Sequence, residues 1–352
     1  MTRVLLVAVG LSLAFQTYAS AQSSVQTTDV TRRSVTTQSE GKFHGSLAEL
    51  STYVGSGSFY VSGYRNPYTA LAFYARPTYD LGTPYKLAVN ARVFVTTELT
   101  APDDPNGQRF YAYDPWFWLS AQNLHTFERA KIRVSGTLRT VLPLSPESRY
   151  QHMLFAVGAG ASLNRKFDFG QAVDPAAQWS LSVSWGFLFS KYVHTSHFRG
   201  DGPGDMTACR APGSLPASGA SAGGAPAASE GDQCGGPANT NFSLQQAFVT
   251  NLARGKWSVG ATLLVINSFK YAFPADVYTA DPAVSLGRSD QTWGIIALGY
   301  QVRPRIGVSV GLSSLQPALD SRYRYPRFPF FDFSGASANN YTNVFASING
   351  TL

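Results

Sequence analysis

Long segments in which large apolar residues alternate with small polar ones constrain this sequence more than any other feature. In WSLSVSWGFLFSKY, residues 179–192, every second residue from Trp179 to Phe189 is large and apolar, and most residues between them are Ser or Gly. A period of two places the two sets on opposite faces of a strand. The same alternation recurs in residues 86–99, 130–142, 153–164 and 305–313.

About twelve such segments follow one another, with no convincing helix between them. We expect strands near 46–60, 68–81, 85–99, 115–124, 130–142, 150–165, 177–194, 242–253, 256–272, 291–302, 305–316 and 340–352. The connections alternate between mostly short ones and long ones, the longest covering residues 195–241. This alternation is typical of an antiparallel up-and-down meander. The prediction is an all-β chain of about twelve strands, with ten as the alternative count.

The apolar faces could pack in a soluble core or contact lipid. Charged residues make up 14% of the chain, against roughly 25% in soluble domains, and the polar faces hold mainly Ser, Thr, Gly and Asn. Many segments have ten or more residues, close to the roughly 9–11 that a tilted membrane strand needs. These features favour a transmembrane barrel with its apolar face toward lipid and its polar face toward the lumen.

The N-terminus carries the pattern of a secretory signal peptide. Arg3 precedes the apolar run 4–15, and Ala19-Ser20-Ala21 forms a small-residue cleavage signal. We expect a signal peptide at 1–21, a flexible periplasmic tail at 22–44 and the barrel at 45–352.

These features resemble the outer-membrane β-barrel proteins of Gram-negative bacteria. The resemblance rests on the signal peptide, the alternating strands, the asymmetric loops and the final segment NYTNVFASINGTL, and covers residues 45–352. It implies a porin-like barrel in the outer membrane, with both termini in the periplasm and the long loop 195–241 outside. The lipid bilayer is then the main partner.

Six charged residues are predicted to line the lumen. Basic residues are expected on inner faces at Arg76, Arg92, Lys131, Arg133 and Arg139, and an acidic one at Glu98. Rings of charged side chains set the selectivity of pores, so these residues predict a weakly basic lumen that favours polar or anionic solutes. The alternative is a salt-bridge network that fills a narrow barrel.

Four tryptophans open predicted strands, as the aromatic belts of barrels do. Trp179 and Trp257 are expected at the short-turn end, and Trp116 and Trp293 at the long-loop end. We predict that all four form interfacial belts.

The chain has two cysteines, Cys209 and Cys234, which lie in the same Gly-, Ala- and Ser-rich loop. In an oxidising compartment such a pair predicts a disulfide. We expect no metal site, cofactor or catalytic group, because no complete ligand set, G-x-S-x-G or H-E-x-x-H motif is present. The formal charge of +7 is scattered, which argues against nucleic-acid binding.

The leading functional hypothesis is a passive pore or export conduit for polar solutes or polymers. The alternative is a plugged structural or surface-interaction barrel whose outer loops bind a periplasmic or surface protein. A barrel enzyme is the least favoured hypothesis.

Overall fold

The computed structural model describes residues 42–43, 45–59, 68–100, 109–169, 178–197, 208–210, 234–235, 238–272, 277–279, 287–318 and 341–351. The signal peptide predicted at 1–21 and nearly all of the tail predicted at 22–44 lie outside these residues, so both stay predictions. Within the described part of the chain, no helix is both long and apolar enough to cross a membrane.

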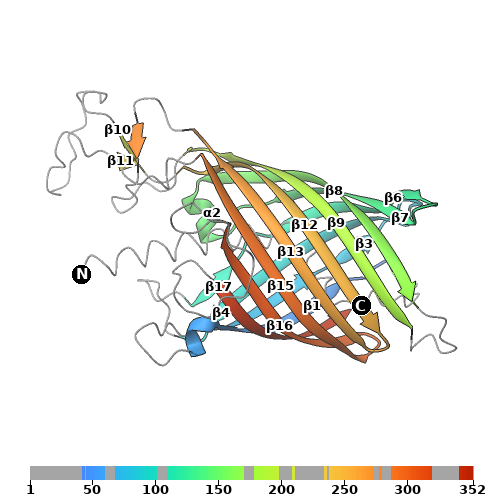
Figure 1. Ribbon diagram of the computed structural model, residues 1–352. Helices are drawn as coiled ribbons and strands as arrows, with labels where there is room; N and C mark the ends of the chain where they lie inside the picture. The colour runs from blue at the N-terminus through green and yellow to red at the C-terminus, as the bar shows by residue number, and fades with distance from the viewer. Residues whose placement is uncertain are drawn as a thin grey trace.

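The described chain is almost entirely β-strand (Figure 1). Every predicted strand is present. Short helical pieces occur at Ser56–Phe59 and at α2 (Pro146–Tyr150). In chain order the strands are β1 (Leu47–Gly55), β2 (Thr69–Arg76), β3 (Thr78–Asp80), β4 (Leu87–Glu98), β5 (Phe110–Ala112), β6 (Trp116–Phe127), β7 (Ile132–Val141), β8 (Met153–Phe169), β9 (Trp179–His194), β10 (Ala208–Arg210), β11 (Cys234–Gly235), β12 (Thr240–Arg254), β13 (Trp257–Lys270), β14 (Val277–Thr279), β15 (Arg288–Arg303), β16 (Ile306–Pro317) and β17 (Tyr341–Thr351).

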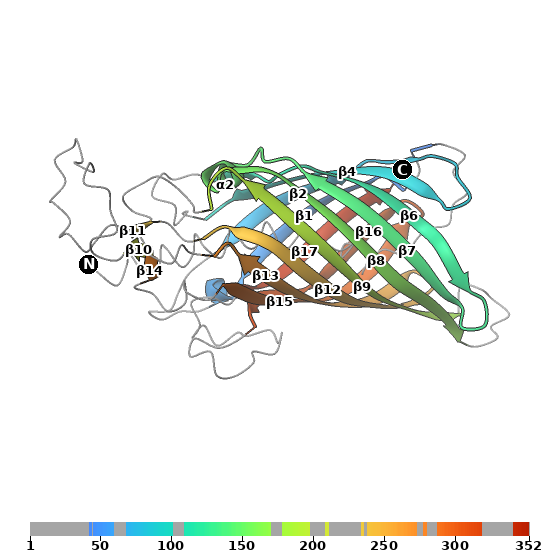
Figure 2. The ribbon, with the colours of Figure 1, turned by 90° about the horizontal axis from the view of Figure 1, so that it is seen from above.

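Twelve of these strands close into one antiparallel barrel, which confirms the predicted fold class (Figures 1 and 2). Around the ring the order is β1, β2, β4, β6, β7, β8, β9, β12, β13, β15, β16 and β17, and β17 pairs with β1. Closure leaves no free edge, so the strands satisfy one another's backbone groups, as a membrane interior requires.

Two short strands extend this ring. β3 continues β2 along β4, and Pro77 separates the two because it has no N–H to donate. The carbonyl of Pro77 still accepts a hydrogen bond from the N–H of Ala91 at 3.1 Å. β5 pairs with β4 beyond the start of β6, so it continues the β6 strand toward the long loops.

Tight turns gather at one end of the barrel and long connections at the other (Figures 1 and 2). Between the paired residues Arg254 and Trp257, the chain reverses in two residues, Gly255 and Lys256. Gly255 has a φ of 54°, a left-handed conformation that glycine adopts without steric cost.

Glycines on β8 let β9 approach closely. A Cβ on Gly160 would lie 2.5 Å from the carbonyl oxygen of Phe187, and one on Gly158 would lie 2.8 Å from that of Phe189. Both distances are shorter than a van der Waals contact, so a larger residue would displace the neighbouring strand. The small residues of the inner face therefore allow neighbouring strands to lie close together where the barrel wall curves.

Candidate functional site

The outer face of the barrel is apolar where the alternation predicts it. On β9, Trp185, Phe187 and Phe189 are 40–45% exposed, whereas Leu188 and Ser190, on the opposite parity, are buried. Further large apolar side chains are exposed on other strands, including Phe155, Val157, Leu138, Phe248, Val259, Ile296, Leu298, Val310 and Ile348. A continuous apolar exterior of this kind is suited to lipid rather than to water.

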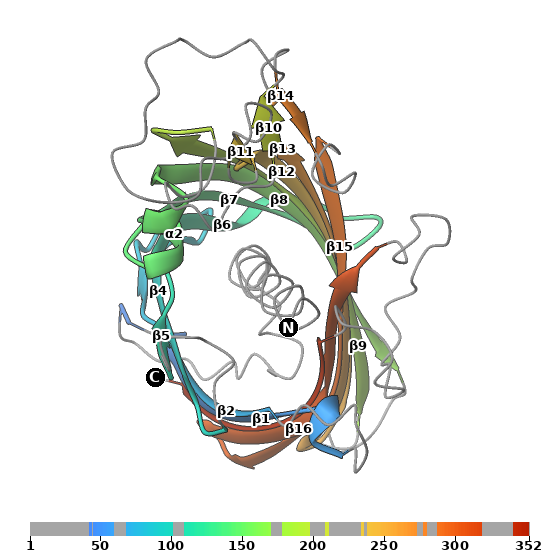
Figure 3. The ribbon, with the colours of Figure 1, turned by 90° about the vertical axis from the view of Figure 1, so that its left-hand side faces the viewer.

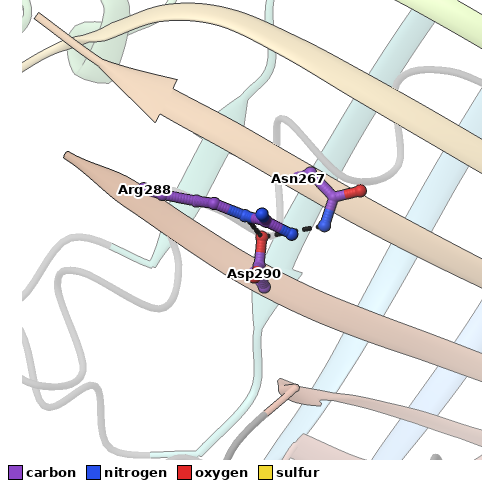
Figure 4. A network of polar contacts seen from close by, with 3 residues as sticks. All are labelled: Asn267, Arg288 and Asp290. Atoms are coloured by element: carbon purple, nitrogen blue, oxygen red, sulfur yellow. Dashed lines mark hydrogen bonds and ion pairs between the residues drawn. The ribbon is translucent and has the colours of Figure 1, made fainter. Parts of the chain in front are cut away.

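Polar groups mark the end of this apolar band near the long loops. Asp290 Oδ1 accepts hydrogen bonds from Arg288 Nε at 2.7 Å and from Asn267 Nδ2 at 2.8 Å (Figure 4). At the opposite end of the same strands, the rings of Trp257 and Tyr300 pack 4.6 Å apart.

The separation of these two boundaries matches a membrane. About ten residues lie between Trp257 and Asn267, or roughly 33 Å along the strand. A strand tilted by about 40° then spans about 25 Å of the bilayer, the height of the apolar band in such barrels.

The structure divides the four predicted belt tryptophans into two pairs. Trp179 and Trp257 are 41% and 55% exposed and lie on the outer face near the short turns, and the belt itself stays a prediction. Trp116 and Trp293 are only 6% and 7% exposed and face the interior, contrary to the prediction. Their parity explains this, because Phe117 and Leu119 carry the outward side chains at the start of β6, and Ile296 and Leu298 carry those of β15.

Trp116 lies between two arginines on the inner wall. The guanidinium carbon of Arg92 is 3.6 Å from the Trp116 ring centroid, and that of Arg139 is 4.5 Å from it. Arg139 also donates a hydrogen bond to Ser190 Oγ at 2.7 Å. Contacts at these distances are cation–π interactions, which hold both cations against the wall. We call Arg92, Trp116 and Arg139 the arginine cluster.

The carboxylate of Asp114, two residues before Trp116, accepts two hydrogen bonds from residues at the start of α2. Asp114 Oδ1 accepts a hydrogen bond from the backbone N–H of Ser145 at 2.7 Å, and its other oxygen accepts one from Ser148 Oγ. Ser145 is the N-cap of α2. The carboxylate thus connects the start of β6 to α2 at the long-loop end of the barrel.

Of the other predicted lumen residues, Arg76 lies opposite Arg92, by the register that pairs Ala75 with Val93 and Thr78 with Asn90, whereas Glu98, Arg133 and Lys131 lie away from the arginine cluster. Arg76 and Glu98 have inward parity at the ends of β2 and β4, and Glu98 accepts a hydrogen bond from Thr100 at 2.8 Å. Arg133 also has inward parity but is exposed near the short turns.

Lys131 lies in the turn before β7, contrary to the prediction of an inner-face residue. Its φ of 52° belongs to the left-handed region, and the side chain is exposed. Lys131 belongs to the turn because β7 begins at Ile132.

The sequence interpretation missed an apolar group on the inner face. Ala247, Leu264, Ile266, Trp293 and Leu315 are buried and pack together, with Ile295 against them. We call these residues the apolar wall. The signal was present in β13, where apolar residues occupy both parities from Leu263 to Ile266.

The two cysteines belong to a small second sheet of order β11, β10 and β14. Its register places the backbone of Cys209 directly opposite that of Cys234. Residues opposed in antiparallel strands have Cα atoms about 4.5–5.5 Å apart, within the range that a disulfide bridges. The disulfide itself stays a prediction.

Aromatic groups surround the histidines where β9 ends. The His197 ring stacks on Tyr271 at 4.2 Å, and the Tyr271 hydroxyl donates to the carbonyl of Tyr192 at 3.1 Å. Burial raises the pKa of the Tyr271 phenol above its ordinary value. Among the described residues, no group of three or more His, Cys, Asp and Glu could hold a metal ion.

No family model and no curated protein matches this chain. Solved structures that resemble it include the NanC porin, with 9% identity and a TM-score of 0.41 over 87% of this chain and 100% of the other. An outer-membrane channel from Pseudomonas putida F1 has 9% identity and a TM-score of 0.45 over 89% and 98%. An anion-selective porin from Comamonas acidovorans has 8% identity and a TM-score of 0.30 over 87% and 98%.

The closed antiparallel ring with its apolar exterior is a porin-like outer-membrane β-barrel fold, and this conclusion rests on the ring and not on the solved structures. It agrees with the location predicted from the sequence, the outer membrane of a Gram-negative bacterium.

Proposed function

We propose that this protein is a passive pore of the outer membrane whose interior favours anions. The supporting observation is the arginine cluster, in which two guanidinium groups flank Trp116 on the inner wall. Fixed positive charge in a narrow, low-dielectric passage raises the local concentration of anions and repels cations.

The reversal potential in planar bilayers under a potassium chloride gradient tests this proposal. Wild-type protein should form channels whose reversal potential has the sign of chloride selectivity. The double variant Arg92→Gln/Arg139→Gln should lose most of this preference. Arg254→Gln is the control, because it removes one positive charge from the outer face beside Trp179, and it should leave selectivity unchanged.

Two results would contradict the proposal. One is the absence of channels from protein whose barrel is folded by circular dichroism. The other is a reversal potential that the double variant does not change.

The second sheet favours a second candidate function, a barrel whose outer loops bind another protein. β10 and β11 come from the connection between β9 and β12, and β14 comes from the next long connection. Pairing between two loops at the long-loop end provides a surface for a partner (Figure 1). Deleting residues 205–236 should then abolish partner binding while leaving the barrel assembled, and unaffected binding would count against this candidate.

A further inference from the structure

Basic side chains gather at the short-turn end of the barrel. In the described part of the chain, the exposed ones at this end are Lys42, Lys86, Arg129, Lys131, Arg133, Arg165, Lys166, Arg254, Lys256, Arg303 and Arg305. The acidic residues described there are Asp80, Glu128 and Asp168. The charges described at the long-loop end nearly balance, because Glu98, Asp114, Glu147 and Asp290 face Arg109, Arg149, Lys191, Lys270 and Arg288.

Three of these arginines lie on the outer face of the wall. Figure 3 looks along the barrel from the long-loop end and shows one closed wall of strands, with an inner and an outer face. Arg165 has the outward parity of the exposed Leu163 on β8, and Arg254 has that of the exposed Phe248 on β12. Arg303 pairs with the first residue of β16, which is exposed on the outer face. We define the basic–aromatic strip as Arg165, Trp179, Arg254, Trp257, Tyr300 and Arg303.

Hydrogen-bonded rows of residues descend toward the short turns in one direction around the ring. The row that starts at Ser51, in the middle of β1, passes through β17, β16, β15 and β13 and ends at Ala253, beside a short turn. Strands that tilt by about 40° produce such a descent, at about one residue of depth for each strand crossed. The same direction leads from β15 through β13, β12 and β9 to β8.

The basic–aromatic strip therefore lies at nearly one depth. A hydrogen-bonded row runs from Tyr300 through Trp257 and Arg254 and ends at Phe169 on β8. This row crosses to four further strands, so Phe169 lies about four residues below Tyr300. Arg165 precedes Phe169 by four residues and is thus about level with Tyr300. The whole strip spans about 8 Å of depth, at the edge of the apolar band.

Aromatic rings hold two of these arginines against the outer face. The guanidinium carbon of Arg254 lies 5.2 Å from the ring centroid of Trp179, and that of Arg165 lies 4.4 Å from the ring centroid of Phe167. Within the described ranges, none of the three arginines of the strip forms an ion pair with a carboxylate. Their N–H groups are therefore available to a phosphate, which a guanidinium binds through two parallel hydrogen bonds.

We propose that the basic–aromatic strip binds anionic phospholipids of the leaflet at the short-turn end. The lipid phosphate accepts hydrogen bonds from an exposed arginine, the glycerol region lies against the aromatic rings, and the acyl chains follow the apolar exterior. The apolar exterior begins directly beside the arginines, so a phospholipid contacts both kinds of surface at once, whereas an acidic protein contacts only the charges. The strip lies outside the lumen, so this inference does not rest on the proposed pore, and Arg254→Gln can weaken lipid binding without changing ion selectivity.

Quenching of tryptophan fluorescence by brominated lipids measures binding at the strip. Trp179, Trp185 and Trp257 are the tryptophans exposed on the outer face, and the other three have inward parity. Trp185→Phe therefore leaves outer-face tryptophans only in the strip. The protein is refolded into phosphatidylcholine vesicles that contain a rising share of either phosphatidylglycerol or phosphatidylcholine brominated close to the glycerol.

The anionic lipid should quench at the lower share. One arginine at an anionic lipid surface changes affinity by about fivefold. Brominated phosphatidylglycerol should therefore reach half-maximal quenching at about a fivefold smaller share than brominated phosphatidylcholine. Because the arginines are exposed, about 1 M salt, which screens charges beyond about 3 Å, should remove most of this preference.

Two double variants in the Trp185→Phe protein separate the strip from the general charge of this end. Arg165→Gln/Arg254→Gln should remove most of the preference for phosphatidylglycerol. Lys86→Gln/Arg129→Gln is the matched control, because it removes two positive charges from short connections at the same end, and it should keep the preference. Circular dichroism checks that both variants form the barrel.

Several results would overturn the inference. They are equal quenching by the two brominated lipids, a preference that persists in high salt, a preference that Arg165→Gln/Arg254→Gln leaves intact, and an equal loss in both double variants. Equal quenching together with retention of the detergent-solubilised barrel on immobilised polyglutamate would assign the strip to an acidic protein instead.

Discussion

Replacing Val310 with arginine puts a charge on the apolar exterior of β16. Val310 is 49% exposed and pairs with Leu298, which is 43% exposed on the same outer face. Val308 pairs with Tyr300 at the short-turn boundary and precedes Val310 by two residues. Because the strands tilt, β16 lies about one residue deeper in the membrane than the residues of β15 paired with it. Val310 therefore lies about 10 Å inside the apolar band of about 25 Å, near its middle.

The expected cost follows from this depth. Arginine near the bilayer midplane destabilises such barrels by about 2–4 kcal/mol, so the folding equilibrium of Val310→Arg should fall by about 30- to 1000-fold. Val302→Arg is the matched control. Val302 is 44% exposed on the outer face but lies beside the turn after β15, where the same change should cost about 0–1 kcal/mol.

Reversible urea unfolding in phospholipid vesicles, followed by tryptophan fluorescence, measures both costs. Neither substitution removes a tryptophan, so the signal is the same in all three proteins. Equal destabilisation by Val310→Arg and Val302→Arg would refute the depth assignment. Little effect of either would refute the lipid-facing exterior.

Two further predictions concern packing and the loop cysteines. Gly311→Ala should destabilise the barrel by about 1–3 kcal/mol in the same assay, because its Cβ would lie 2.3 Å from a backbone carbonyl oxygen of β15. Gly307→Ala should cost less, because its Cβ would meet at 2.8 Å only the end of a flexible Asn side chain, and a larger cost there would contradict this reasoning. Cys209 and Cys234 should give a reduction-dependent shift on gels, which Cys209→Ser abolishes without affecting assembly, and an absent shift in wild-type protein would argue against the bridge.

The fold could be predicted because alternation along each strand depends on short-range sequence. Each residue pair in WSLSVSWGFLFSKY reports which side faces lipid, and the long and short connections report the order of the strands. Closure of the ring follows from this order, because β1 and β17 would otherwise expose their edges.

The arrangement of the interior could only partly be predicted. Arg92 and Arg139 were recognised as inward by their parity, but their convergence on Trp116 depends on the register between β4, β6 and β7. The prediction for Trp116 is wrong because it used the place of Trp116 at the start of a strand and not its parity. β5 continues the same strand toward the long loops, so Trp116 does not lie at the rim of the barrel.

The apolar wall was missed for a related reason. An inner face is expected to be polar, so alternation alone does not identify an apolar group on it, although apolar residues occupy both parities from Leu263 to Ile266. The side chains that complete the wall come from β12, β15 and β16, and no single segment reveals that they pack together.

Cysteine accessibility along β9 tests most directly that one face of the barrel meets lipid and the other an aqueous interior. Single cysteines would replace Ser182, Ser184, Trp185 and Phe187 in protein whose two native cysteines are changed to serine. A charged, membrane-impermeant maleimide should label positions 182 and 184 and leave positions 185 and 187 unlabelled in lipid vesicles. Equal labelling of all four, or labelling of positions 185 and 187 alone, would contradict the assignment of the two faces.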